Sequence, residues 1–555
     1  MSENLSGSGR QGQAGGVSRR SVLKNAAVFG AGAVCLCMLP GCAHKEGASP
    51  AKKVAGLSQL PGGTPVKGGT FTVGVISGGE QENLFPGTSV GTPDFVRNFN
   101  LYSLLFYLGE KVNPLVPGLA LSAEPNATAT VWRFKLRDGV VWHDGKPFSA
   151  DDVVYNFKTV WSNPSLNYAS GLLAGLVDYS GVRKIDRLTV EVPLKSAAAQ
   201  FPTLFAYFLF PLVQDGATPE STAKHPIGTG PFKFASFTPG KRSEFVANPD
   251  YWEEGKPHVD RLVVDSSFTD TTAIFNAMLN GDINLYPSLP LVTAREQLSS
   301  KKVQILQSPL AAQTYMFAMR VDKGQFADNR VREGFKYLVD RQAMINGAWS
   351  GFGEVAHDIM APGTEYFASD LKRRHDPDRA RSLFKAAGVL GDTFVLPTTN
   401  FLPGMVESST ILAQQAKAAG IEVQVQTKSA ATYFTPAGGF LSREFGYEVN
   451  QPYASLLAGY RSELTTGAPY PDTRWGDQSN GKAAQQLLER AIASTGSDSA
   501  GLWHQAQAQQ FHEGGYLAWG NLPYVDAAAN DVRGLTGGAG FSYNNWRLCD
   551  GWIAS

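Results

Sequence analysis

A serine between two glycines is the first feature that could support covalent chemistry. Residues 87–91 read Gly-Thr-Ser-Val-Gly and match the G-x-S-x-G pattern, in which Ser89 would be the nucleophile of an acyl transfer. This pattern needs a strand before it and a helix after it, because a tight turn must expose the hydroxyl. Pro86 precedes the segment and Pro93 follows it, so we expect an ordinary turn.

Signals for cofactor and metal chemistry are equally weak. Gly351, Gly353 and Ala356 match a dinucleotide fingerprint only loosely, and no predicted strand leads into them. His504 and His512 could share one face of a predicted helix, but surface or core positions explain them better than a metal site. The sequence contains no H-E-x-x-H, C-x-x-C or Walker A motif. We therefore predict no catalytic residue, no metal site and no cofactor.

The elements that could position a binding site are clearest between Val131 and Lys158. VWRFKLR alternates apolar and polar residues and predicts a strand, which Asp138-Gly139 ends with a turn. Ser149 is suited to cap a following helix, whose first turn carries acidic residues. The segment predicts a strand, a tight turn and a helix within an α/β core.

The residue order of this segment resembles the family 5 solute-binding proteins of ABC importers, the oligopeptide, dipeptide and nickel binders. Their pattern reads roughly P-x-L-A, then F-x-L-R-x-G-V-x-F-x-D-G-x-P-x-x-A-x-D-V. The resemblance extends over nearly everything after Lys67. The other matching blocks, in family order, are PGLA at 117–120, HPIGTGPFKF at 225–234 followed by NPDYWEEGKPHVD, and FADNRVREGFKYLVDRQAMI at 326–345.

The resemblance implies an α/β fold, a bilobed periplasmic-binding-protein type II clamshell of the cluster C type with an extra small insertion domain. A hinge would lie near residues 308–313 and 521–525 and would let the lobes close over a ligand. The expected parts are a discontinuous lobe I at 70–100, 205–313 and 523–555, an insertion domain at 101–204, and lobe II at 314–522.

Composition agrees with a large globular protein. The chain has 555 residues, 43% of them hydrophobic and 18% charged, so it can bury a large core. Its formal net charge of zero shows no excess of positive charge for binding nucleic acid. We expect strands at 69–76, 188–192 and 261–265, and helices at 330–348, 405–419, 483–493 and 501–513.

The first 41 residues predict an export signal. SRRSVLK at 18–24 matches the twin-arginine pattern, and an apolar run follows it. Leu39-Pro40-Gly41-Cys42 resembles a bacterial lipobox, so Cys42 is the expected site of lipidation, with a flexible tether over 42–69. We expect an extracytoplasmic protein that its lipid anchors to the cell membrane. Cys549 would be the one cysteine left without lipid, and its role is open.

Glu448 is the main ligand-binding candidate. Peptide-binding members of the family carry a W-x-x-D-x-x-x-P pattern whose Asp pairs with the peptide's α-amino group. Residues 445–452 read FGYEVNQP, which places Phe445 at the Trp position and Glu448 at the Asp position. The resemblance therefore implies a cationic ligand end at Glu448, although the longer side chain would shift that anchor. An exposed glutamate at a strand end is the alternative.

Other residues are weaker candidates for the ligand site. Gly79 and Glu80 follow the first predicted strand, where their backbone could pair with an extended ligand. Arg474 could hold a carboxylate bidentately, with Trp475 beside it. The candidate aromatic walls are Trp349, Phe401, Tyr447 and Tyr453, each of which could equally belong to the core.

Together these patterns predict a monomeric, non-enzymatic binding protein that delivers a short peptide or peptide-like amine to an ABC permease and its ATPase. A nickel or other metal chelate, or an oligosaccharide, is the alternative ligand, because the fold alone does not fix function. In other classes, a secreted hydrolase or a ligand sensor without a permease would fit the same export signals.

Overall fold

The computed structural model describes residues 54, 57, 62–89, 91–109, 115–308, 313–429, 433–435, 439–477, 481–538 and 540–554. The predicted export signal and Cys42 lie outside these ranges, as does most of the predicted tether. Within these ranges, no helix combines the length and the apolar character that crossing a membrane requires.

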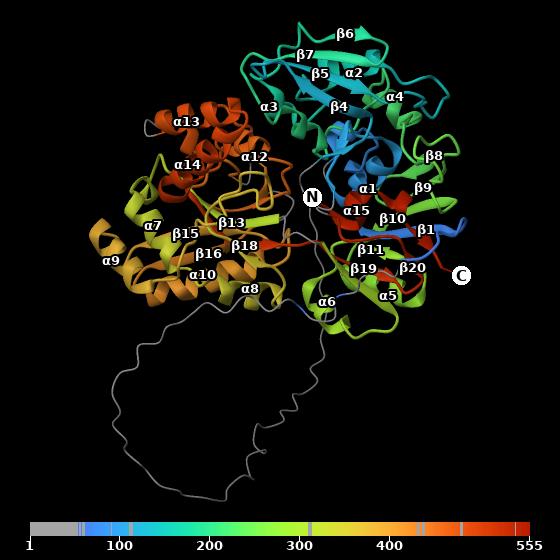
Figure 1. The fold of residues 1–555 in the computed structure, drawn as a ribbon. Coiled ribbons are helices and arrows are strands. Elements are labelled where there is room, and N and C mark those ends of the chain that lie inside the picture. Colours follow the sequence, from blue (N-terminus) through green and yellow to red (C-terminus); the bar gives the residue numbers. More distant parts are fainter. Residues whose placement is uncertain are drawn as a thin grey trace, which may run out of the picture. The chain divides into compact units, whose positions relative to one another are not determined.

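The largest sheet joins strands from distant parts of the chain (Figure 1). β1 (Thr70–Ile76) pairs in parallel with β10 (Arg261–Phe268) and with β11 (Leu285–Tyr286). β19 (Val525–Ala529), from near the C-terminus, pairs antiparallel with β11 and with β12 (Val303–Gln307). The full order is β12-β19-β11-β1-β10-β9-β8, with β8 at Phe232–Thr238 and β9 at Arg242–Ala247.

β1 is held in this sheet by its apolar side chains. Phe71 and Val73 are completely buried, as the predicted strand at 69–76 requires. Loop residues after β1 form a short 3-10 turn and lead into the first helix. Several helices lie in the sequence between or close to the strands of this sheet. They are α1 (Thr92–Leu101), α4 (Pro219–Lys224), α5 (Thr271–Asn280), α6 (Leu291–Gln297) and α15 (Ser542–Trp546).

The segment from Val131 to Lys158 contributes a strand to a separate four-stranded sheet, in the order β4-β5-β7-β6. β5 (Val131–Leu136) alternates buried and exposed residues, as predicted. Ser149 caps α2 (Ala150–Tyr155) in a capping box with Asp152, also as predicted. The other elements are β4 (Ala120–Pro125), β6 (Arg183–Asp186), β7 (Thr189–Pro193), α3 (Ser170–Leu173) and the 3-10 helix Phe201–Ala206.

A second four-stranded sheet has the order β14-β18-β13-β17, which leaves β17 at one edge. β13 (Gln313–Met319) lies between β17 (Phe445–Asn450) and β18 (Tyr516–Leu522), and both pairings are antiparallel. β14 spans Glu354–Val355 and pairs with β18. A further parallel pair consists of β15 (Thr393–Thr398) and β16 (Glu422–Thr427).

The helices expected at 405–419, 483–493 and 501–513 are present, and the helices at 377–387 and 456–463 were not predicted. The helix expected at 330–348 is two helices, α7 (Asn329–Leu338) and α8 (Arg341–Trp349). The break follows from Asp340, whose side chain accepts a hydrogen bond from the Ala343 amide and caps α8. The remaining helices are α9 (Pro377–Ala387), α10 (Met405–Ala418), α12 (Leu456–Glu463), α13 (Gly481–Ala493) and α14 (Ser497–Glu513).

Two chain connections join the largest sheet to the sheet of β13 and β18. β12 ends at Gln307 before β13 begins, and β18 ends at Leu522 before β19 begins. Ser308 and Tyr524 tie these connections together: each backbone amide donates to the other residue, the Ser308 N–H to the Tyr524 carbonyl and the Tyr524 N–H to Ser308 Oγ, both at 2.9 Å. The predicted hinge segments therefore run side by side at this point.

Candidate functional site

A small pocket lies beside edge strand β17. Its walls come from the end of β13, from the loop before β17, from β17 itself and from the loop that carries Asp472. In β17, Gly446 lies opposite Ala318 and Glu448 lies opposite Met316 of β13. The lining residues are Ala318, Phe440, Leu441, Arg443, Gly446, Tyr447, Glu448 and Asp472.

Strand periodicity separates Glu448 from its aromatic neighbours. The rings of Phe445 and Tyr447 both pack against Phe317 in the core, and each residue is 2% exposed. The Tyr447 hydroxyl is engaged there with Ser408 Oγ at 2.8 Å. Because side chains alternate between the two faces of a strand, Glu448 points to the other face, where it is half-buried. Phe445 and Tyr447 therefore support the strand from the core side.

Glu448 and Asp472 form a pair of acidic groups in this pocket. Burial raises the pKa of Glu448 well above its usual range, and the negative charge of Asp472 raises it further. Burial also raises the pKa of Asp472, to about 6. Both carboxyl groups line this pocket, and the negative charge of Asp472 favours a proton on Glu448. Glu448 Oε1 also accepts a hydrogen bond from the Val449 amide at 3.0 Å.

A third carboxyl group, that of Glu463, lies deeper in the same region. Glu463 is the last residue of α12 and is 4% exposed. Burial raises its pKa to about 8, and the hydroxyl of Tyr453 donates to its Oε1 at 2.8 Å. The Tyr453 ring stacks on Tyr207, with the ring centroids 6.5 Å apart. Tyr453 thus connects the acidic region to the segment that follows the 3-10 helix Phe201–Ala206.

The nearby arginines do not neutralise these acids by direct contact. Arg320 makes two hydrogen bonds to Asp322, at 2.7 and 2.6 Å. Arg443 stacks on the Tyr433 ring at 3.7 Å and donates to the Tyr433 carbonyl. Among the described residues, Glu448, Glu463 and Asp472 enter no ion pair. Buried acids without a cationic partner favour a ligand that brings positive charge.

Arg474 and Trp475 both make contacts within the protein. Arg474 Nη1 lies 3.3 Å from Asp477 Oδ2, so part of its guanidinium is already occupied by an acid of its own chain. Trp475 is 3% exposed and belongs to the hydrophobic core. This loop contributes Asp472 to the pocket, whereas the carboxylate-binding role of Arg474 stays a prediction.

Of the two other candidate aromatic walls, one is buried and one is exposed. Trp349 is completely buried, with its ring centroid 4.1 Å from Trp519, and its indole N–H donates to the Pro403 carbonyl. Phe401 is 52% exposed and contacts the ring of Phe434. Trp349 thus packs the core, and Phe401 retains a surface that a ligand could contact.

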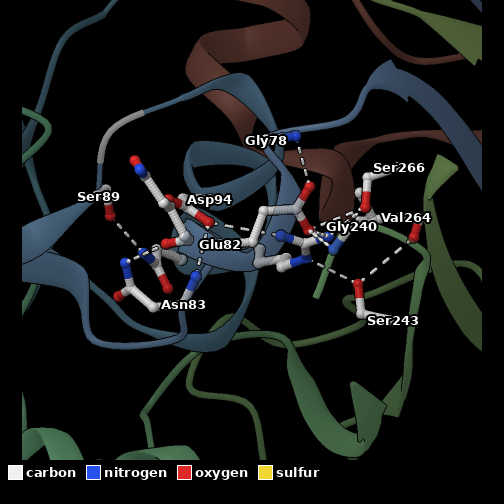
Figure 2. Close-up of polar contacts among 12 residues, drawn as sticks. Gly78, Glu82, Asn83, Ser89, Asp94, Gly240, Ser243, Val264 and Ser266 are labelled. Carbon is white, nitrogen blue, oxygen red and sulfur yellow. Dashed lines mark hydrogen bonds and ion pairs between the residues drawn. The ribbon is translucent and has the colours of Figure 1, made fainter. Parts of the chain in front are cut away.

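A buried polar network holds the loop after β1 in place (Figure 2). Gly79 has φ of 69°, which only glycine adopts without strain, and it begins the 3-10 turn Gly79–Gln81 that contains the exposed Glu80. The Gly78 amide donates to Glu82 Oε1 at 2.8 Å. Gly240, in the turn between β8 and β9, presses against Gly79, since a Cβ placed at Gly240 would lie 3.2 Å from the Gly79 Cα.

Arg97 is the centre of this network. Its Nη2 donates to Glu82 Oε2 at 2.8 Å and to Ser266 Oγ at 2.9 Å, and its Nε donates to Ser243 Oγ at 2.8 Å. Figure 2 shows Glu82 reaching from the loop toward the residues of β9 and β10. Arg97 and Glu82 thus lock the predicted cleft-edge loop onto the sheet.

The structure offers no support for chemistry at the weak motifs. Ser89 follows the 3-10 turn Pro86–Thr88, and its buried hydroxyl donates to the Pro86 carbonyl and accepts from Asn98 Nδ2. His504 Nε2 is engaged with Asp370 on the surface at 2.9 Å. In the part of the chain that the structure describes, no three His, Cys, Asp or Glu side chains gather to hold a metal ion.

Sequence reasoning missed the partners of Glu448. Neither Asp472 nor Glu463 is among the site residues that the sequence predicts. A single sequence gives no signal that pairs these residues across a fold. The alternation in FGYEVN, by contrast, already separates Phe445 and Tyr447 from Glu448 once a strand is assumed.

A family model and curated relatives match the chain. The model for bacterial extracellular solute-binding proteins, family 5, matches residues 114–442. The dipeptide-binding protein of Escherichia coli K12 is 29% identical over 54% of this chain and 60% of its own length. The nickel-binding periplasmic protein of the same organism is 30% identical over 49% of this chain and 53% of its own length. The matches thus span little more than half of each relative.

Solved structures share the fold over most of the chain. A periplasmic binding protein of Helicobacter pylori, solved with a bound peptide, has a TM-score of 0.75 at 18% identity, covering 88% of this chain and 99% of its own. A nickel–histidine-binding protein of Campylobacter jejuni has a TM-score of 0.71 at 19% identity, covering 87% and 99%. The fold is therefore the α/β, bilobed type II periplasmic-binding-protein fold, as predicted.

Proposed function

Because the chain belongs to the family 5 bacterial extracellular solute-binding proteins, we propose that it captures a short peptide or peptide-like amine outside the cytoplasm and delivers it to an ABC permease. Its lipidated Cys42 would anchor it to the cell membrane. The protein would act as a monomer and without catalytic turnover.

The observation that carries this proposal is the acidic pocket of β17. Glu448 stands at the position where the family resemblance implies a carboxylate for the ligand's α-amino group. Asp472 adds a second carboxyl group to the same pocket, and neither Arg320, which binds Asp322, nor Arg443, which donates to the Tyr433 carbonyl, forms an ion pair with it. A protonated amine would supply the missing positive charge and several N–H donors at once.

The loop after β1 supports an extended ligand. Gly79 and Glu80 lie in a turn that Arg97 and Glu82 hold in place, so their backbone is ordered before any ligand arrives. A preordered backbone lowers the entropic cost of pairing with a peptide strand. Glu448 would hold the ligand's amino end, and this loop would contact its backbone.

Native mass spectrometry of protein purified from its own host tests this proposal. The expected result is a co-purified peptide or amine, whose synthetic form raises the unfolding temperature in a thermal shift assay. Nickel chelates and oligosaccharides serve as comparison ligands in the same assay. Stabilisation by a chelate or a sugar, with none by peptides or amines, would contradict the proposed ligand class.

A further inference from the structure

The pocket beside β17 presents two carboxyl groups to the same space. Asp472 is only 9% exposed, and its Oδ2 receives no hydrogen bond from any N–H or hydroxyl group of the described residues. Glu448 is anchored by one backbone amide, that of Val449. A buried acid with an oxygen left open is costly unless a proton or a cation satisfies it.

Among the described residues, no cation forms an ion pair with Glu448 or Asp472. Glu448 and Asp472 line the same pocket, and the negative charge of Asp472 favours a proton on Glu448, so the pair holds one proton. Glu463 of α12 raises the pKa of Glu448 further where Glu463 is itself ionised. The other charged or titratable groups facing the pair are Arg320 at the end of β13, Tyr433, Arg443, Tyr470, Arg474 and Tyr516 of β18.

None of these arginines replaces the proton. Arg320 is committed to Asp322, and Arg474 is paired with Asp477. Arg443 lies over the Tyr433 ring and lines the pocket; its Nη2 donates to a backbone carbonyl, and its Nη1 has no hydrogen-bond partner among the described residues. These cations lower the pKa of Asp472 from a distance without making an ion pair with it. The proton therefore stays on the pair of carboxyl groups itself.

We propose that Glu448 and Asp472 form a one-proton pair that exchanges this proton for the cationic group of the ligand, so that capture releases a proton. This inference rests on the proposed function, because it needs a ligand with a cationic end. The ligand's ammonium keeps its own protons. The O–H bond of the carboxylic acid breaks, the freed proton passes to the buffer, and both carboxylates then face the ammonium.

The exchange has a definite pH dependence. Below the pH at which the empty pair ionises, each bound cation must displace one proton. Affinity for a cationic ligand then rises by up to about tenfold for each pH unit. Above that pH the pair is already ionised, and the affinity becomes independent of pH. A neutral ligand would release no proton.

Isothermal titration calorimetry of the mature protein tests the exchange with trialanine as the probe. Titrations in two buffers of different ionisation enthalpy report the protons released. We expect close to one proton per bound trialanine at pH 6 for the native protein, and a smaller release for Asp472→Asn, in which burial alone still raises the pKa of Glu448. Trialanine binding without proton release by the native protein would overturn the inference.

Infrared spectroscopy of the empty protein tests the pair without a ligand. The native protein should show one more protonated carboxyl band at pH 6 than Glu448→Gln, while Glu444→Gln, which alters an exposed acid before β17, should leave the spectrum unchanged. Equal band intensity in the native protein and Glu448→Gln would overturn the inference. If trialanine does not bind but the band is present, the proposed ligand fails and the shared proton stands.

Discussion

Arg97 and Glu82 form an ion pair with 2.8 Å between Nη2 and Oε2, and their side chains are 0% and 2% exposed. Glu82 also accepts hydrogen bonds from the Gly78 and Gly240 amides. The loop after β1 is thus tied to the largest sheet by a charge pair that water does not reach.

Replacing Arg97 with Met should destabilise the protein by about 3–5 kcal/mol, because it leaves the Glu82 carboxylate buried without its partner. Urea unfolding measures this change. The matched control is Arg242→Met, which removes a surface pair with Glu244 and should cost less than about 1 kcal/mol. Equal effects of the two variants would show that the buried pair has no special role.

Asp526 should make stability depend on pH. This residue is completely buried, and burial raises its pKa to about 7, against an unfolded value of about 3.9. The folded state therefore binds the proton more tightly. Its contribution is complete below about pH 4 and is lost as the pH rises through 7, by roughly 2–4 kcal/mol at pH 8.

Urea unfolding at pH 5 and pH 8 tests this expectation with Asp526→Asn. The variant should lose less stability than the native protein between the two pH values, since its side chain cannot ionise. The exposed Asp282→Asn serves as the control and should follow the native protein. Parallel behaviour of Asp526→Asn and the native protein would refute the assignment.

Replacing Trp349 should destabilise the protein much more than replacing Phe401. Trp349→Ala opens a cavity beside Trp519 and should cost about 3–5 kcal/mol of stability. Phe401→Ala changes a half-exposed ring and should cost about 0.5 kcal/mol or less. Thermal unfolding measures both. A large loss for Phe401→Ala together with a small one for Trp349→Ala would reverse their assigned positions.

Cys42→Ser should release the mature protein from the membrane, because the lipid on this thiol is its proposed anchor. Fractionation of cells, followed by intact mass measurement, tests this. Cys549→Ser is the matched control: Cys549 is 1% exposed, and its loss should leave the membrane attachment unchanged. Membrane retention of Cys42→Ser would contradict lipid anchoring.

The motif blocks were sufficient to predict the family and the fold, since the order of residues in 131–158 and 225–234 is specific to one architecture. Local signals also placed the Ser149 cap and the alternating strand β5 correctly. The break between α7 and α8 was missed because the cap at Asp340 interrupts an otherwise helical pattern.

The acidic pocket could be predicted only in part. Glu448 was found through its place in a family pattern, but Asp472 and Glu463 reach it from α12 and a following loop. Such pairings depend on tertiary packing, for which a single sequence has no periodicity or spacing rule. Burial likewise decided that Trp349 and Trp475 belong to the core, since aromatic residues suit either role.

The affinity of trialanine for Glu448→Gln tests the central claim most directly. Loss of the charge-assisted contact should weaken binding by roughly 10- to 100-fold in calorimetry. N-acetyl-trialanine, which lacks the cationic end, should bind weakly to the native protein, and Glu444→Gln should bind trialanine normally. Trialanine binding that is equally tight in Glu448→Gln and the native protein would contradict the claim that Glu448 holds the ligand's cationic end.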